Sequence, residues 1–336
     1  MEKVSIFIPI TPYTISIAES LIENNINELS LSENILINPH GLEYKKQYWD
    51  EVIEDYSSRK VQRNVVKTYL NFFKQIYVFI KIYKRLRKYK KRKIDFYYVD
   101  LAHVLSNSVF FSFKSIENRF IIEDGILNYY KLTLKDKMLG RKRVNVFLQL
   151  IGLPTKTFAG DITGIEMPEV NKQFVFFPKE AFFPSKSDQI PYTRLEYSLN
   201  NKILILGQEP ISKFVTEQRY LSSLDIIIQD MIKKLDHFEL YYKPHHHGKK
   251  ELTREFLKAK YKVNFIESNL PIHMFIKEIA PSVVVSFGST ASLNLKLLLP
   301  KNVKSYVYLF RDPQLPDNTY IEELFLKIGV LITELN

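Results

Sequence analysis

Short apolar runs alternate with longer segments of helical periodicity along the first half of the chain. Residues 4–10 form an apolar run typical of a buried strand, and residues 15–22 carry apolar side chains at helical spacing. Thr11 and Pro12 lie between them as a helix N-cap and first helical residue. The same alternation predicts strands at 34–37, 94–99, 120–122 and 174–177, and helices at 61–92 and 102–111.

A second alternation begins at residue 202, after a stretch at 183–201 whose prolines and polar residues indicate a linker. Residues 131–158 are basic and show no regular period. Alternating strands and helices indicate parallel sheets covered by helices. The second half is expected to contain strands at 203–206, 238–242, 263–266, 282–287 and 303–309, and helices at 217–235, 251–260, 272–279 and 291–299.

Two α/β units joined by one linker predict the GT-B architecture, in which two Rossmann-like domains face each other across a cleft. We expect an N-terminal domain over residues 1–195 and a C-terminal domain over residues 196–336. In open α/β sheets, ligands bind beyond the carboxyl ends of the strands. Three candidate motifs occupy that position.

The first motif, Glu123-Asp124-Gly125, directly follows a predicted strand. A carboxylate held there could remove a proton from an acceptor hydroxyl, and the glycine lets the backbone approach a ligand. Adjacent carboxylates raise each other's pKa when partly buried, which favours a base. The alternative is an ordinary acidic turn.

The second motif, Lys243-Pro244-His245, follows the strand at 238–242 and continues into His246 and His247. Consecutive histidines on an extended chain point in different directions, and the chain has no cysteine, so a metal site is disfavoured. The favoured interpretation is that His245 donates to a leaving phosphate. A solvated loop is the alternative.

The third motif, Gly288-Ser289-Thr290, lies at a strand-to-helix turn. Free N–H groups and the positive end of the helix dipole suit a phosphate there, and two hydroxyls add donors. A plain N-cap is the alternative. The chain also lacks a P-loop and the Asp-X-Asp pair that holds a metal in many sugar transferases. Protein groups would therefore have to receive the leaving phosphate.

Taken together, the motifs resemble those of bacterial sialyltransferases that modify lipooligosaccharide and capsule, including the polysialyltransferase group. That family carries an acidic-acidic-Gly motif, a His-Pro motif and a Ser-Ser/Thr motif in this order. Thr11-Pro12 is similar to its opening, and residues 203–207, which end at Gly207, resemble its second-domain entry strand. The family reads Pro-His-Pro where this chain has Pro244-His245-His246.

The resemblance implies an inverting sialyltransferase that uses CMP-sialic acid, a surface-glycan acceptor and no metal or other cofactor. Asp124 would be the base, with Glu123 and Gly125 supporting it, and His245 the acid or charged donor toward CMP. Ser289 and Thr290, with Gly288, Pro244 and Gly207, would bind the donor. Two alternatives are a metal-independent GT-B transferase with another donor and a non-catalytic glycan- or membrane-binding protein.

The net charge of +11 indicates an acidic partner, and many of the cations gather between Lys81 and Lys93. That stretch is either a solvated helix end or a peripheral contact with an anionic membrane. Nucleic acid is not expected, because no zinc-finger or RNP motif is present. The N-terminus is interrupted too soon for a signal peptide, and no apolar window could span a bilayer. We therefore expect a cytoplasmic protein, in contact with the inner face of the membrane if the basic stretch binds it.

Overall fold

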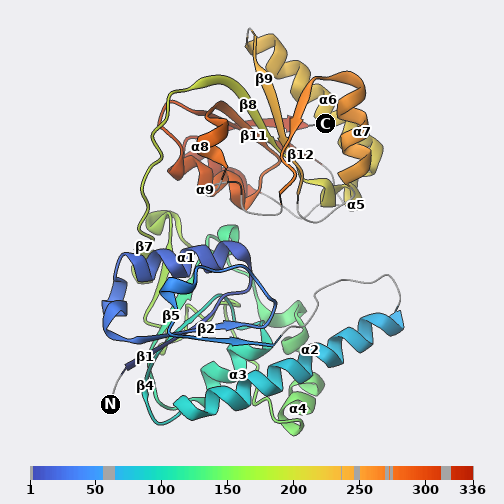
Figure 1. Cartoon of the computed structure of the whole chain (residues 1–336). Helices are drawn as coiled ribbons and strands as arrows, with labels where there is room; N and C mark the ends of the chain where they lie inside the picture. The colour runs from blue at the N-terminus through green and yellow to red at the C-terminus, as the bar shows by residue number, and fades with distance from the viewer. Residues whose placement is uncertain are drawn as a thin grey trace. The chain divides into compact units, whose positions relative to one another are not determined.

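The computed structural model describes residues 3–55, 65–235, 237–245, 250–268, 272, 275–311 and 319–335. The chain divides into two compact units, Met1–Pro191 and Tyr192–Asn336. The division falls inside the predicted linker, ahead of the expected boundary after residue 195. Each unit is an α/β domain with its own parallel sheet (Figure 1).

The sheet of the first unit has seven strands in the order β3-β2-β1-β4-β5-β6-β7, all parallel. Its strands are β1 (Lys3–Ile8), β2 (Glu33–Asn38), β3 (Glu51–Glu54), β4 (Lys93–Tyr98), β5 (Ile116–Ile122), β6 (Lys172–Val175) and β7 (Ser187–Gln189). Its helices are α1 (Pro12–Glu23), α2 (Val65–Leu86), α3 (Val104–Ser112) and α4 (Lys142–Leu150).

Both faces of this sheet are covered, because successive residues of a strand point to opposite sides. Val4, Ile6 and Ile8 of β1 join a buried cluster with residues of α2 and α3. On the other face, Phe7 stacks on Tyr97 at 4.3 Å between ring centroids. Helix α1 covers that side (Figure 1).

The second unit has a six-stranded parallel sheet in the order β10-β9-β8-β11-β12-β13. Its strands are β8 (Asn200–Leu206), β9 (Glu239–Lys243), β10 (Val263–Phe265), β11 (Pro281–Ser286), β12 (Lys304–Phe310) and β13 (Leu331–Leu335). Its helices are α5 (Ser212–Val215), α6 (Glu217–Lys234), α7 (Lys250–Lys260), α8 (Ile276–Ile279), α9 (Thr290–Leu298) and α10 (Thr319–Lys327).

Successive side chains of β8 also point to opposite faces of the sheet, and each face has its own core. Ile203 and Ile205 join a buried cluster with α6 and α7, whereas Leu204 and Leu206 join one with α8 and α9. Each sheet places its first strand beside its fourth, so the chain reverses its winding between β1 and β4 and between β8 and β11. These two switch points are where a doubly wound sheet presents a ligand crevice.

Several elements differ from the predictions. The stretch at 131–158, expected to be irregular, contains α4, and the predicted linker contains β7. Strands β3 and β13 and helix α10 were not predicted. The two strands lie at sheet edges and are only partly enclosed, so their apolar residues form neither a buried run nor a regular alternation. The helix expected at 272–279 is shorter, over Ile276–Ile279, although residues 273 and 274 lie outside the described residues.

No helix in the described part of the chain combines the length and the apolar character needed to cross a bilayer.

Candidate active site

The first candidate motif lies at the carboxyl end of β5. Strand β5 is the neighbour of β4, which together with β1 forms the first switch point. Glu123 is fully buried, and Asp124 beside it is half-buried. The backbone N–H of Asp124 donates to Oδ1 of Asn128 at 2.9 Å. Gly125 follows with φ of +70°, which turns the chain sharply after the carboxylates. The motif is therefore an ordered strand-end turn with one carboxylate inside and the other at its rim.

Three donors converge on the Glu123 carboxylate. The Tyr13 hydroxyl donates to Oε1 at 2.8 Å, while the Tyr129 hydroxyl and the Phe176 backbone N–H each donate to Oε2 at 2.7 Å. Burial nevertheless raises the pKa of Glu123 from 4.5 to about 7, because desolvation outweighs these donors. Glu123 consequently ties α1, β5 and β6 together behind the Asp124 turn.

The N-terminus of α1 places Tyr13 in this network. Thr11 is the N-cap, and its side chain and that of Thr14 form a reciprocal capping box, with Pro12 at the first helical position as predicted. The cap sets the direction in which α1 leaves β1. Tyr13, the second residue of the helix, then reaches a carboxylate 110 residues along the chain.

The other two motifs lie on either side of β8, since β9 and β11 are its neighbours in the sheet. Parallel strands bring their carboxyl ends to one edge, so Gly207, His245 and Ser289 all follow strands at the edge containing the second switch point. Pro244 is buried and His245 half-buried. His246 and His247 lie outside the described residues.

A buried carboxylate organises the His245 turn. Oε2 of Glu209 accepts the backbone N–H of His245 at 2.8 Å, and Oε1 accepts the Tyr242 hydroxyl at 2.9 Å. Glu209 is 3% exposed, and this burial raises its pKa. The Tyr220 hydroxyl extends the network, because it lies 3.0 Å from that of Tyr242 and accepts the Gln208 N–H at 2.9 Å.

Gly207 is required by this network. A Cβ built at residue 207 would lie 2.2 Å from the Tyr242 hydroxyl and 3.0 Å from Oε1 of Glu209. Its own N–H donates to the Lys243 carbonyl at 2.8 Å, which joins the ends of β8 and β9. The backbone after β8 can therefore approach the tyrosine only because residue 207 has no side chain.

Ser289 is the N-cap of α9, but its hydroxyl makes no capping bond to its own helix. Its Oγ lies 3.3 Å from Oγ of Ser292, which also contacts buried Ser286. Gly288 has φ of +71°, and a Cβ there would lie 2.6 Å from Leu309. The turn thus leads tightly from β11 into α9 and leaves the helix N-terminus without a cap from the Ser289 side chain. The side chain of Thr290 is not among those described.

Sequence reasoning missed the residues that hold these motifs in place: Tyr13, Tyr129, Glu209, Tyr220 and Tyr242. The sequence held one weak indication for Glu209: it comes shortly after a predicted strand and Gly207, much as Glu123 comes directly after a predicted strand. Within the ranges that the structure describes, no three His, Asp or Glu residues are grouped so that they could hold a metal ion.

Comparisons by sequence find no relative, since neither a family model nor a curated protein matches the chain. Solved structures do match. An α/β-galactoside α-2,3-sialyltransferase from Photobacterium phosphoreum superposes with a TM-score of 0.58 at 12% identity, over 99% of this chain and 98% of that one. A 2,6-sialyltransferase from another Photobacterium, solved with CMP and lactose, gives 0.59 at 9% identity, over 98% of this chain and 78% of that one.

The UDP-GlcNAc 2-epimerase of Methanocaldococcus jannaschii also matches, with a TM-score of 0.51 at 15% identity, over 99% of this chain and 89% of that one. The chain therefore has the GT-B fold, and structures of bacterial sialyltransferases are similar to it along nearly its whole length. Because an epimerase shares the fold, the fold alone does not select the reaction.

Proposed function

We propose that the protein is an inverting, metal-independent sialyltransferase that moves sialic acid from CMP-sialic acid to a hydroxyl of a surface glycan of the lipooligosaccharide or capsule type. The observation that supports this most strongly is the edge of the second sheet. There the His245 turn and the N-terminus of α9, which the Ser289 side chain does not cap, flank the switch strand β8. Buried Glu209 fixes the backbone of the His245 turn. A nucleotide monophosphate is the chemistry that this edge suits.

In the proposed reaction, Asp124 accepts the proton of an acceptor hydroxyl as that oxygen attacks the anomeric carbon. The bond from the anomeric carbon to the phosphate oxygen of CMP breaks on the opposite face, which inverts the configuration. His245 donates a proton or a charged hydrogen bond to the departing phosphate. The N–H groups at the start of α9 and the Ser289 hydroxyl stabilise the charge that develops on it.

The structure supports dividing the roles of the two acidic residues. Glu123 is enclosed and its oxygens are occupied by Tyr13, Tyr129 and Phe176. Asp124 lies at the rim of the same turn with its backbone held by Asn128. A base must reach the proton that it removes, so Asp124 is the better placed of the two and Glu123 supports the turn.

Donor turnover by the purified protein tests the proposal. We expect release of CMP from CMP-sialic acid, faster in the presence of a galactoside acceptor, and unchanged activity in excess EDTA. Release of UDP from a UDP-sugar instead would identify a GT-B transferase with another donor. Interconversion of UDP-sugars without transfer would indicate an epimerase, and the absence of any turnover would favour the binding-protein alternative. Loss of activity on chelation, restored by magnesium, would contradict the metal-free mechanism.

A further inference from the structure

Helices α2 and α4 expose large apolar side chains on adjoining surfaces. The side chains of Phe73 and Tyr77 on α2 are 53% and 60% exposed, and that of Leu150 on α4 is 82% exposed. The ring of Phe73 lies 6.5 Å from that of Phe147 on α4, so the two helices present their apolar residues together. We call this the α2–α4 face and define it as Phe73, Tyr77, Val146, Phe147 and Leu150.

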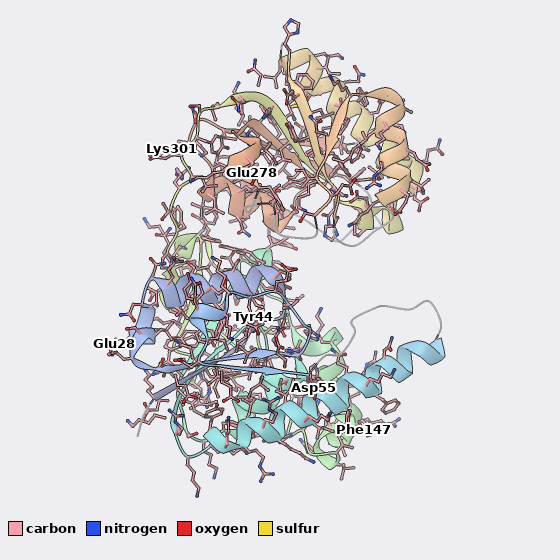
Figure 2. All side chains as sticks on the ribbon, viewed as in Figure 1. Glu28, Tyr44, Asp55, Phe147, Glu278 and Lys301 are labelled. Atoms are coloured by element: carbon pink, nitrogen blue, oxygen red, sulfur yellow. The ribbon has the colours of Figure 1, made fainter. Side chains whose placement is uncertain are left out.

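The face is continuous along each helix. Phe73 and Tyr77 are four residues apart, as are Val146 and Leu150, so each pair lies on one side of its helix. The opposite side of α2 carries Ile76, Phe79 and Ile82 into the core. Figure 2 shows Phe147 beside the α2 ribbon. Single exposed apolar residues are common on soluble proteins, but a contiguous group of aromatic and aliphatic side chains marks an interaction surface.

Cations border the face. Arg141, Lys142 and Arg143 at the start of α4 are all exposed, and so is Lys74 on α2. No acidic residue occurs between Lys137 and Gly160, or between Val65 and Ile94. None of these four cations forms an ion pair with an acid among the described residues. These four cations at the border of the α2–α4 face therefore carry positive charge that no described acid compensates.

The three cations of α4 oppose the helix dipole. The N-terminus of a helix favours negative charge, yet α4 has no acid in its first turn, and its N-cap, Arg141, makes no capping bond. Helix stability therefore does not account for Arg141, Lys142 and Arg143. An external anion bound beside them would compensate their charge and that of the helix end.

The basic stretch Lys81–Lys93, which the sequence suggested as a membrane contact, is more fully paired. Lys81 lies 3.4 Å from Asp55, Lys88 lies 2.6 Å from Glu51, and Lys93 lies 2.9 Å from Glu117. Arg92 pairs with Glu33. Four acids thus offset part of the charge of the nine cations in the stretch. The cations at the start of α4 have no such partner among the described residues, and they lie on the helix that carries Val146, Phe147 and Leu150.

We infer that the α2–α4 face docks on an anionic lipid surface. Lipid phosphates would neutralise Arg141, Lys142 and Arg143, and the apolar side chains would enter the boundary between headgroups and acyl chains. A soluble polyanion such as a nucleic acid would pair with the cations. It would offer no apolar environment in which Phe147 and Leu150 could be buried. The inference concerns a surface outside the proposed active site and does not rest on the proposed reaction.

Vesicle binding tests the inference. We expect the full-length protein to sediment with vesicles of phosphatidylcholine and phosphatidylglycerol, and much less with phosphatidylcholine alone. Replacing Arg141, Lys142 and Arg143 with Gln should weaken binding to the anionic vesicles about a hundredfold. The double variant Phe147→Ser/Leu150→Ser should weaken it about tenfold or more. Circular dichroism would verify the fold, which these exposed residues should not disturb.

Two control variants separate this face from the rest of the surface. Ile226→Ser/Leu326→Ser removes exposed apolar residues from the second unit and should leave vesicle binding unchanged. Lys88→Gln/Lys93→Gln removes two cations that are paired with Glu51 and Glu117, and should weaken binding less than the α4 triple variant. If this double variant were the more damaging, the contact would lie on the Lys81–Lys93 stretch and the inference would be wrong.

A fluorescence probe tests the same contact without removing apolar or charged side chains, and is therefore informative if one of the variants above fails to fold. Trp49, the single tryptophan, is buried, so Phe147→Trp adds a reporter at the face. Its emission should shift to shorter wavelength on addition of anionic vesicles and remain unchanged with neutral ones. No shift, or no sedimentation of the wild-type protein, would overturn the inference. A concentration-dependent dimer that Leu150→Ser dissociates, without vesicle binding, would assign the face to a second copy of the chain.

Discussion

The backbone N–H of His245 donates a 2.8 Å hydrogen bond to Oε2 of Glu209, a carboxylate that is 3% exposed. The other oxygen of the same carboxylate accepts the Tyr242 hydroxyl. Glu209 follows β8, and both of its partners belong to β9 or the turn after it. The position of the candidate catalytic histidine is thus set by the neighbouring strand as well as by its own.

Glu209→Ala should lower kcat about tenfold or more with a smaller change in KM, because His245 would lose the acceptor that holds its backbone. Glu209→Gln should cost less, since its amide oxygen can still accept the His245 N–H. The alanine variant should also lose about 1–3 kcal/mol of stability, as two donors lose their buried acceptor. Steady-state kinetics and urea unfolding measure both effects, with Glu255→Ala on the exposed side of α7 as the control. A folded Glu209→Ala protein with wild-type kcat would remove Glu209 from any positioning role.

Asp124→Asn should leave the fold intact and reduce turnover about 100-fold or more, which is the usual size of a general-base contribution. Glu123→Gln should cost less, because an amide can keep its oxygen toward Tyr129 and Phe176 and donate to the Tyr13 hydroxyl. The measurement is the rate of transfer at saturating donor and acceptor for both variants. Near-normal transfer by Asp124→Asn would exclude Asp124 as the base.

Stability should depend on pH through Glu123. Its pKa is about 7 in the folded chain, above its ordinary 4.5, so the folded state binds the proton more tightly than the unfolded state. The associated stabilisation is complete below pH 4.5 and is lost as the pH rises through 7. The shift corresponds to about 3 kcal/mol.

The Glu123→Gln variant isolates this contribution, because it cannot ionise. Relative to wild type, it should become more stable by about 3 kcal/mol between pH 4.5 and 8. Urea unfolding of both proteins across that range measures the difference. A constant difference would show that Glu123 does not titrate there.

His245→Ala should reduce activity about 100-fold or more, and far more than His246→Ala or His247→Ala. Buried Pro244 and the Glu209 contact hold the backbone of His245, and a donor that is already ordered loses less entropy when it meets the developing charge. The three variants should be compared at saturating CMP-sialic acid. A greater loss for His246→Ala would move the catalytic role by one residue, and three mild losses would leave the motif as a solvated loop.

Gly207→Ala should destabilise the protein by about 1–3 kcal/mol, because the new methyl group would overlap the Tyr242 hydroxyl. Adding Tyr242→Phe removes the overlapping oxygen and should restore part of the loss. Unfolding midpoints of the single and double variants measure this coupling. Strictly additive losses would contradict the close approach of residues 207 and 242.

Local sequence determined the main strands and helices of the two α/β units. The apolar runs of β1, β4, β8 and β11 are long enough to identify buried strands, and Thr11-Pro12 marked the start of α1 through capping chemistry confined to neighbouring residues. The candidate motifs could be located at strand ends for the same reason. Edge strands such as β3 and β13 escaped detection because one side of each is only partly enclosed.

Only the tertiary structure decided which residues support those motifs. The Tyr13 hydroxyl meets Glu123 across 110 residues, and Glu209 meets His245 across 36. Both contacts depend on which strands become neighbours, and strand order is set by the burial of whole sheet faces rather than by any short pattern. The sequence therefore determined where the candidate chemistry lies along the chain. The strand order and packing within each unit determined which buried carboxylates and tyrosines hold it in place.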